Sequence, residues 1–303
     1  MSLVGFAPLR NETHMNQTTG LVFTKMHGLG NDYLYVYADE VPQDIVELSV
    51  KYSDRHFGVG SDGIICILPS KVADFQMRIF NADGSEAMMC GNGIRCVGKY
   101  VHDKGYTDKT VITVETKSGI KTLDLTLDDA GQVALVSVEM GTVKIGEPII
   151  TQASCGYFYD EVTQSFGPSA RDEDDFPLIP VDMGNPHAVI FCTDAEAVDI
   201  EAIGSALEHC AAFPDGVNVE FVQVISKTEI RMRVWERGSG VTMACGTGSC
   251  ASVAAAIWAH KCTRASDVTV HLDGGDLIVS IDYDNNVTMK GAAAFICDGV
   301  TIG

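Results

Sequence analysis

Hydrophobic positions along the chain fall mostly into short alternating or apolar runs, and only a few stretches repeat every three to four residues. The short runs predict strands and the longer periodic stretches predict helices. Many strands with about one long helix in each half favour an α+β architecture over a doubly wound sheet. The predicted strands are Val22–Lys25, Tyr33–Tyr37, Val111–Glu115, Leu123–Leu127, Val133–Met140, Glu229–Val234, Val268–Leu272, Leu277–Ile281 and Val287–Lys290, and the predicted helices are Asp44–Tyr52, Gly93–Lys104, Ile200–Cys210 and Gly248–Lys261.

The two halves of the chain also resemble each other. The segments Met77–Asn81 and Met232–Glu236 share one pattern, and each precedes a Cys-Gly-x-Gly at the same distance. A Gly-Asn pair precedes each cysteine motif as well, ending at Asn31 and at Asn185. This repeat predicts a duplicated domain with a pseudo-twofold relation, although a repeat of this kind can also be purely structural.

Composition and charge narrow the class of protein. The chain has 303 residues, 46% of them hydrophobic, which is enough for two domains of about 150 residues. A net charge of −20 argues against nucleic acid or an anionic membrane as a partner, because both would repel the protein. The sequence contains no run of 18 apolar residues, so it predicts no membrane span. Residues 1–20 lack the apolar region of a signal peptide and are interpreted as a tag-like, disordered leader outside the fold.

Ten cysteines are scattered along the chain. Their wide spacing differs from the dense framework of a small secreted domain, and none forms a Cys-x-x-Cys pair that would indicate structural zinc. We therefore expect reduced thiols in a cytoplasmic protein, with no metal site. Cys66, within an apolar run, is predicted to be a buried hydrophobic residue.

The two Cys-Gly-x-Gly motifs carry the candidate chemistry. Cys90 and Cys245 each stand where a strand-like segment ends and a helical pattern begins. Unpaired N–H groups and the helix dipole at such a position favour the thiolate, and so lower the pKa of the cysteine from its ordinary value of about 8.5. Two such thiols facing each other across a domain cleft could remove a proton from one face of a Cα and return one to the other. Simple packing, or a disulfide between Cys90 and Cys245, is the alternative interpretation.

Several segments, in the same order along the chain, resemble the diaminopimelate epimerase family from about Phe23 onwards. This resemblance implies interconversion of LL- and meso-2,6-diaminopimelate, a small-molecule substrate of lysine and peptidoglycan-precursor biosynthesis, without pyridoxal or any other cofactor. The segments are Lys25–Asp32, Asn81–Glu86, Met89–Cys96, Gly184–Ala188, Glu236–Gly238 and Ala244–Gly248.

The resemblance also implies a fold. It predicts two pseudo-symmetric domains, each a mixed, barrel-like sheet around a central helix, formed by residues 21–143 with 291–303 and by residues 144–290. The active site would lie in the cleft between them, and the protein would be a homodimer.

Site residues are implied by the resemblance position by position. Cys90 and Cys245 match the proton-transfer pair, whereas His187 and Glu236 match residues that tune the ionisation of the thiols. The matching substrate-binding positions are Asn31, Gly63, Asn81, Gly91, Asn92, Asn185, Asn218, Glu236, Arg237, Gly246 and Thr247. The chain departs from the family at Gly63, where some members have Gln, and at Val241, where many have Glu.

Other functions remain open from the sequence. A related racemase acting on proline, hydroxyproline or histidine would use the same two thiols. The proline type carries Cys-Gly-His at the first motif, which Asn92 disfavours, and Arg237 favours a substrate with a second charged end. A non-enzymatic thiol or metal-binding protein is a further alternative, and it predicts metal in the purified protein.

Overall fold

The computed structural model describes residues 20–147, 149–150, 158–160, 165–167, 177–210 and 212–302. Within these ranges the chain divides into two compact units. Segments of Met1–Gly28, Asp32–Val136 and Ala293–Gly303 form the N-terminal unit, and segments of Leu29–Asn31 and Ser137–Ala292 form the C-terminal unit. The predicted leader, apart from Gly20, lies outside the described residues.

The N-terminal unit is a mixed sheet with two helices. Strands β2 and β3 pair in parallel, β3 and β4 antiparallel, β4 and β6 in parallel, and β6 and β7 antiparallel. β1 pairs antiparallel with β21, which brings the two ends of the chain into one unit. The elements are β1 (Val22–Gly28), β2 (Asn31–Tyr37), α1 (Ile45–Ser53), β3 (Gly63–Pro69), β4 (Phe75–Asn81), β5 (Glu86–Ala87), α2 (Gly91–Asp103), β6 (Val111–Thr116), β7 (Gly119–Leu127), the start of β8 (Val133–Thr142) and β21 (Ala294–Val300).

The C-terminal unit repeats this order of pairings. β14 and β15 pair in parallel, β15 and β16 antiparallel, β16 and β18 in parallel, and β18 and β19 antiparallel. The sequence repeat therefore reflects a repeat of topology. The elements are the end of β8, β9 (Lys144–Ile145), β10 (Ile149–Ile150), β11 (Phe158–Asp160), β12 (Ser165–Gly167), β13 (Pro177–Asp182), β14 (Pro186–Cys192), α4 (Ile200–Glu208), β15 (Asn218–Ser226), β16 (Glu229–Glu236), β17 (Gly240–Val241), α5 (Gly246–Trp258), β18 (Val268–Leu272), β19 (Gly275–Ile281) and β20 (Asn286–Gly291).

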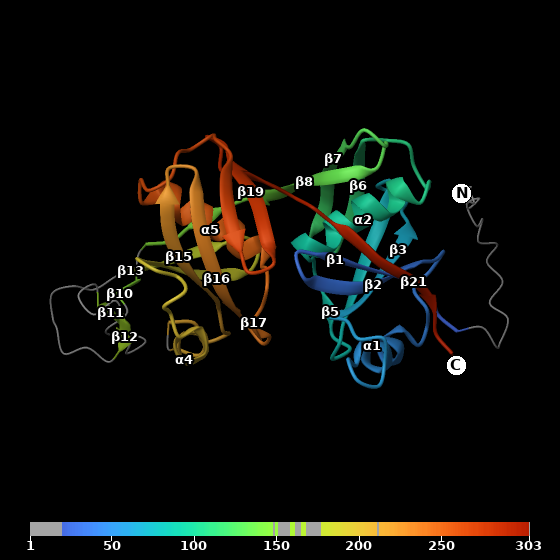
Figure 1. Cartoon of the computed structure of the whole chain (residues 1–303), viewed down its shortest axis with the longest axis horizontal. Helices are drawn as coiled ribbons and strands as arrows, with labels where there is room; N and C mark the ends of the chain where they lie inside the picture. The colour runs from blue at the N-terminus through green and yellow to red at the C-terminus, as the bar shows by residue number, and fades with distance from the viewer. Residues whose placement is uncertain are drawn as a thin grey trace, which may run out of the picture. The chain divides into compact units, whose positions relative to one another are not determined.

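One long helix lies among the strands of each unit, α2 in the first and α5 in the second (Figure 1). In α2 the apolar side chains Ile94, Val97 and Val101 are fully buried. Gly98 allows close packing against β7, because a Cβ there would lie 3.0 Å from Leu123 Cδ2. Nearly every residue of α5 is buried, and small side chains from Ala251 to Ala256 give it a narrow profile. Each helix can therefore sit inside its sheet with its N-terminus fixed.

The predicted α+β architecture is confirmed. Both long helices begin two residues earlier than expected, at Gly91 and Gly246, because the glycines after each cysteine already belong to the first turn. The strands β3, β14 and β15 were not predicted. β3 and β14 are buried almost throughout, and β15 is buried over its first five residues, so they lack the alternation that marks a half-exposed strand. None of the described helices has both the length and the apolar content needed to cross a membrane.

The cysteines differ from the expectation at one position. Eight of them, including Cys90 and Cys245, are free thiols in the described residues, and Cys66 is fully buried as predicted. Cys210 is disulfide-bonded, so the expectation of ten reduced thiols is wrong there. A disulfide needs two Cα atoms within about 7 Å, which only the tertiary fold decides. Cys155 lies outside the described residues.

The free energy of unfolding is expected to fall as the pH rises above about 9. Burial raises the pKa of Cys66 and Cys192 to about 12 and that of Cys96 to about 11. The folded state keeps these protons while the unfolded chain releases them near pH 8.5, so the unfolded state gains up to about 1.4 kcal/mol per thiol for each pH unit above that point. Urea unfolding at about pH 8 and pH 10 measures the decline. A Cys66→Ala variant should decline less steeply, and equal stability at both pH values would contradict the prediction.

Candidate active site

The N-terminal half of the candidate site is built on the first turn of α2. Cys90 is the N-cap, with extended backbone angles of φ −133° and ψ 116°, and its Sγ accepts a hydrogen bond from the Gly93 N–H at 3.3 Å. The sulfur thus takes the place that a serine or aspartate oxygen takes in other helix caps. Glycine at position 93 packs closely against β3, because a Cβ there would lie 2.7 Å from Ile65 Cδ1. Cys90 itself is half-buried.

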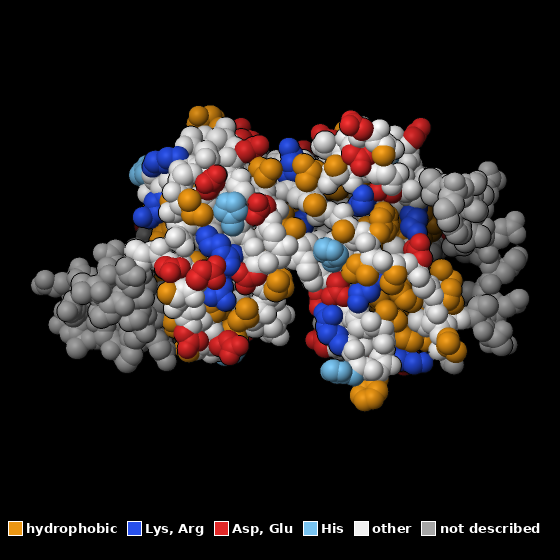
Figure 2. Space-filling model, viewed as in Figure 1, with side chains coloured by type: hydrophobic (Ala, Val, Ile, Leu, Met, Phe, Trp, Pro, Cys, Tyr) orange, Lys and Arg blue, Asp and Glu red, His pale blue; other side chains and the backbone are white. Residues whose placement is uncertain are grey.

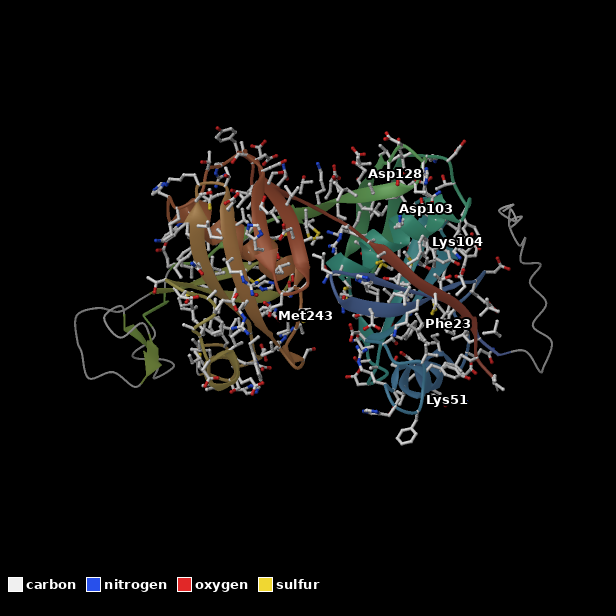
Figure 3. All side chains as sticks on the ribbon, in the orientation of Figure 1. Phe23, Lys51, Asp103, Lys104, Asp128 and Met243 are labelled. Carbon is white, nitrogen blue, oxygen red and sulfur yellow. The ribbon has the colours of Figure 1, made fainter. Side chains whose placement is uncertain are left out.

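The C-terminal half has the same construction on α5. Cys245 is the N-cap with φ −118° and ψ 114°, and its Sγ accepts from the Gly248 N–H at 3.3 Å. The Thr247 hydroxyl lies 3.6 Å from the same sulfur. Cys245 is buried, with 5% of its surface exposed. Met243, two residues earlier, lies half-exposed in the loop before α5 (Figure 3).

The electrostatic surroundings of Cys245 reverse one expectation. Burial raises the pKa of the Cys245 thiol well above its ordinary value, and the carboxylates of Glu236 and Glu220 raise it further. The Gly248 N–H and the Thr247 hydroxyl act in the opposite direction, but their effect is smaller. A helix N-terminus alone would acidify this thiol. Desolvation and two negative charges outweigh it, so Cys245 is a thiol and not a thiolate near neutral pH.

Glu236 lies at the end of β16 beside Cys245. Its carboxylate accepts a hydrogen bond from the Thr242 hydroxyl and is also hydrogen-bonded to Cys245. Burial raises the pKa of Glu236, and these hydrogen bonds partly offset that shift. The nearby departure from the family, Val241, is a partly exposed residue of β17 paired with Trp235.

His187 is paired with a carboxylate that the sequence did not single out. Its Nδ1 lies 2.6 Å from Glu220 Oε1, its Nε2 lies 3.1 Å from Asn185 Oδ1, and the His187 and Glu220 side chains are fully buried. The available signal was a single acidic residue inside the apolar run Val217–Val224. An acidic residue inside a buried strand requires a partner, and His187 supplies it.

Asn218 and Arg237 are joined to each other. Asn218 Nδ2 donates to the Pro186 carbonyl at 3.0 Å, and its Oδ1 accepts from the Arg237 backbone N–H at 3.0 Å. The Arg237 guanidinium donates to the Asp215 carbonyl at 3.1 Å, and Arg237 is an exposed residue. Asn218 therefore holds the backbone of the residue whose side chain carries the positive charge.

The remaining predicted positions lie in the first turns of the helices and on two strand ends. Asn92 is buried in α2, and Gly246 is buried in α5. Asn81 ends β4 and pairs with Gly63 across the sheet. Asn31 begins β2 but groups with the C-terminal unit, where a Cβ at the adjacent Gly30 would lie 3.1 Å from Met243 Cβ. Gly91 is the first residue of α2.

The backbone at position 63 leaves no room for a side chain. The φ of Gly63 is +154°, and a Cβ at this position would lie 2.2 Å from the Phe80 carbonyl oxygen in the neighbouring strand. Gly63 therefore has only its backbone to offer a substrate.

Comparison with solved structures defines the class of fold. The chain matches a phenazine biosynthesis protein of the PhzF family from Bacillus anthracis with a TM-score of 0.71, at 18% identity over 94% of this chain and 99% of that one. A hydroxyproline epimerase from Agrobacterium vitis matches with a TM-score of 0.65, at 15% identity over 93% and 90% of the two chains. At these identities the likeness concerns the fold alone.

Sequence comparison identifies the family. The diaminopimelate epimerase family model matches residues 23–146 and 179–296. The diaminopimelate epimerase of Acetivibrio thermocellus is 49% identical over 91% of this chain and 97% of its own length, and that of Phocaeicola vulgatus is 48% identical over 93% and 98%. The chain belongs to the diaminopimelate epimerase family, whose members are isomerases.

Proposed function

We propose that this chain interconverts LL- and meso-2,6-diaminopimelate by moving a proton off and onto one Cα. The observation that carries the proposal is the matched pair of N-cap cysteines, each with its sulfur 3.3 Å from a helix N–H in its own unit. Inversion of a carbon requires one group on each of its faces, and Cys90 and Cys245 supply two equivalent groups. The names of the relatives supply the substrate.

The protonation of Cys245 supports a direction for the first step. Its environment favours the thiol, so Cys245 begins a cycle as the proton donor, and Cys90 begins it as the base. The Cys90 thiolate removes the Cα proton and becomes a thiol. Cys245 then delivers its proton to the opposite face and becomes a thiolate. The reverse reaction starts from that second state.

The helix ends provide for the charge that develops on the substrate. Loss of the Cα proton shifts negative charge onto the adjacent carboxylate, and N–H groups at a helix N-terminus stabilise such charge. We assign this role to the backbone of Gly91–Asn92 and Gly246–Thr247, and assign the distal carboxylate to Arg237, whose planar fork can bind two oxygens. Water must be excluded during transfer, since a hydrated thiolate is too weak a base for a Cα–H.

The proposal includes two copies of the chain and a reducing cytoplasm. Exposed apolar side chains on β1, α1 and β21 support an interface with a second copy, and hydrophobic side chains gather over this part of the N-terminal unit (Figure 2). They are Val22, Val46, Val50, Ile296 and Val300. Sedimentation equilibrium measures whether one or two chains are present. A reducing compartment keeps both catalytic thiols available.

Isotope incorporation tests the reaction. Incubated with LL-diaminopimelate in deuterated water, the enzyme is expected to form meso product with deuterium on the inverted Cα, while unreacted substrate keeps its protium at early times. The reason is that the proton removed and the proton delivered sit on different sulfurs. Proton NMR and mass spectrometry follow both pools.

Two results would contradict parts of the proposal. Early meso product that retained the original protium would exclude the two-thiol scheme. Turnover of histidine, proline or hydroxyproline with no exchange of any diaminopimelate isomer would leave the scheme in place and overturn the substrate.

A further inference from the structure

Glu220 neither gives nor takes the proton in the transfer described above. Its side chain is fully buried on β15, with one oxygen held by His187 and the other, Oε2, without a hydrogen-bond partner among the described residues. A buried carboxylate is costly for a protein to maintain. A carboxylate kept at this cost beside a candidate catalytic thiol suggests a functional role for Glu220.

The fold does not require a carboxylate at this place. The separation in sequence that relates Cys90 to Cys245 also relates Ile65 to Glu220, and the two residues occupy the same register position in the two repeated sheets. Each faces the glycine of its own helix turn. A Cβ at Gly93 would lie 2.7 Å from Ile65 Cδ1, and a Cβ at Gly248 would lie 2.7 Å from Glu220 Oε1. One unit is thus built with an apolar side chain where the other holds a charge.

A continuous series of polar contacts leads from Glu220 to the sulfur of Cys245. His187 joins Glu220 at 2.6 Å and Asn185 at 3.1 Å. The Asn185 amide nitrogen lies 3.4 Å from the Thr247 hydroxyl, and that hydroxyl lies 3.6 Å from the sulfur. All five residues belong to the C-terminal unit.

Two directions of hydrogen bonding can run through His187, Asn185 and Thr247. With His187 protonated on both nitrogens, Nε2 donates to the Asn185 carbonyl, the Asn185 amide donates to Thr247, and the Thr247 hydroxyl donates to a thiolate. With Nε2 unprotonated, the Asn185 amide turns over to donate to it, Thr247 donates to the Asn185 carbonyl, and the sulfur loses the Thr247 donor, while the Cys245 thiol donates to the Glu236 carboxylate. Imidazole and amide orientations of this kind depend on the network that surrounds them.

We propose that Glu220 is a positioning residue that, through His187 and Asn185, sets whether Thr247 donates its hydrogen bond to the Cys245 sulfur or to the Asn185 carbonyl. Glu220 Oε1 holds the buried imidazole through Nδ1, and the opposite nitrogen, Nε2, then orients Asn185 and with it Thr247. The inference rests on the proposed function only in treating Cys245 as a proton-transfer group. The thiolate form of Cys245 exists in half of each catalytic cycle, and the series gives it a donor then.

The charged groups that face Cys245 act on its acidity in opposite directions. Glu236 and Glu220 both repel a thiolate, and the first turn of α5 attracts one. A Glu220→Gln replacement therefore has two consequences. It removes a direct repulsion, which makes Cys245 more acidic, and it removes the charge that orients Thr247, which makes Cys245 less acidic.

A double-mutant cycle with Thr247→Val separates the two consequences, because valine keeps the shape of threonine and cannot pass on a hydrogen bond. The readout is the pH midpoint for alkylation of Cys245 by iodoacetamide, with mass spectra that resolve Cys245 from Cys250. With Thr247→Val in place, Glu220→Gln should lower the midpoint. With Thr247 present, Glu220→Gln also removes the hydrogen bond that Thr247 donates to the sulfur, and this loss raises the midpoint. The shift measured from the Thr247 parent should therefore be about one pH unit more positive than the shift measured from the Thr247→Val parent. Equal shifts in both backgrounds would overturn the proposal.

A matched control and an unmutated measurement complete the test. Glu208 is a buried carboxylate of the same unit that is hydrogen-bonded to Trp235 and lies outside the series. Glu208→Gln should shift the midpoint equally in both backgrounds. In the unmodified protein, ¹⁵N NMR of the imidazoles should show His187 with a proton on Nδ1 throughout the range from about pH 6 to pH 9. A proton on Nε2 alone would refute the series even if Glu220→Gln failed to fold.

These measurements need no substrate. If the protein did not act on diaminopimelate but the midpoints behaved as expected, the proposed function would fail and the role of Glu220 would stand. If epimerisation were found and the midpoints were additive, the reverse would hold.

Discussion

Replacing Cys90 with alanine, or Cys245 with alanine, is expected to lower kcat/KM for epimerisation by about a thousandfold or more. In the proposed scheme each thiol is either the base or the acid in every turnover, so neither can substitute for the other. Each single variant should still bind substrate, because the helix N–H groups belong to the backbone. In deuterated water, each should exchange the Cα proton of at most one stereoisomer, and inversion should be lost in both directions.

Cysteines in the same helices serve as controls. Cys96 and Cys250 are fully buried in α2 and α5 and do not cap either helix. Their replacement by alanine should cost some stability through lost packing and leave kcat/KM close to that of the parent. If either Cys90→Ala or Cys245→Ala retained full turnover, two-thiol transfer would be wrong.

Replacing Arg237 with methionine is expected to lower kcat/KM by about a hundredfold or more, the usual consequence of removing one partner of a charged pair that substrate binding buries. The guanidinium donates to one backbone carbonyl, and the Arg237 backbone is anchored by Asn218. It is thus positioned with donors to spare for the second carboxylate of diaminopimelate. The kcat/KM of Arg237→Lys should lie between those of the parent and Arg237→Met, because an ammonium group keeps the charge but cannot bind both oxygens in a planar fork.

The loss should depend on the substrate. Diaminopimelate carries a second carboxylate, so the Arg237→Met variant should lose activity on it through KM as well as kcat. Arg264→Met is the control, since Arg264 is a partly exposed arginine of the same unit that donates to the Asp282 carbonyl and to Asn285 Oδ1. An unchanged kcat/KM for Arg237→Met would remove Arg237 from the substrate site and reopen the choice of substrate.

Much of the candidate site could be predicted because its signals are local. A cysteine followed by two glycines at the start of a helical pattern determines the N-cap geometry almost by itself, and both caps formed as expected. The repeat was equally visible, because two copies of one topology keep similar residues at similar spacing. The family motifs then extended these two positions to the asparagines, His187, Glu236 and Arg237.

Other features depended on residues that are distant in sequence. Glu220 stands out in its strand, but only the parallel pairing of β14 with β15 places it against His187. The central strands were missed for a related reason, since a strand buried on both faces shows no period. The disulfide at Cys210 was also missed, because the pairing of cysteines depends on the tertiary fold.

The sequence by itself determined that two equivalent cysteines cap two equivalent helices, because capping and helical periodicity are properties of neighbouring residues. The protonation of one of them was decided only by the tertiary structure. The helix end alone would make Cys245 acidic, whereas folding buries it beside the carboxylates of Glu236 and Glu220, and its pKa rises instead. Desolvation and through-space charge act between residues that the chain brings together only on folding.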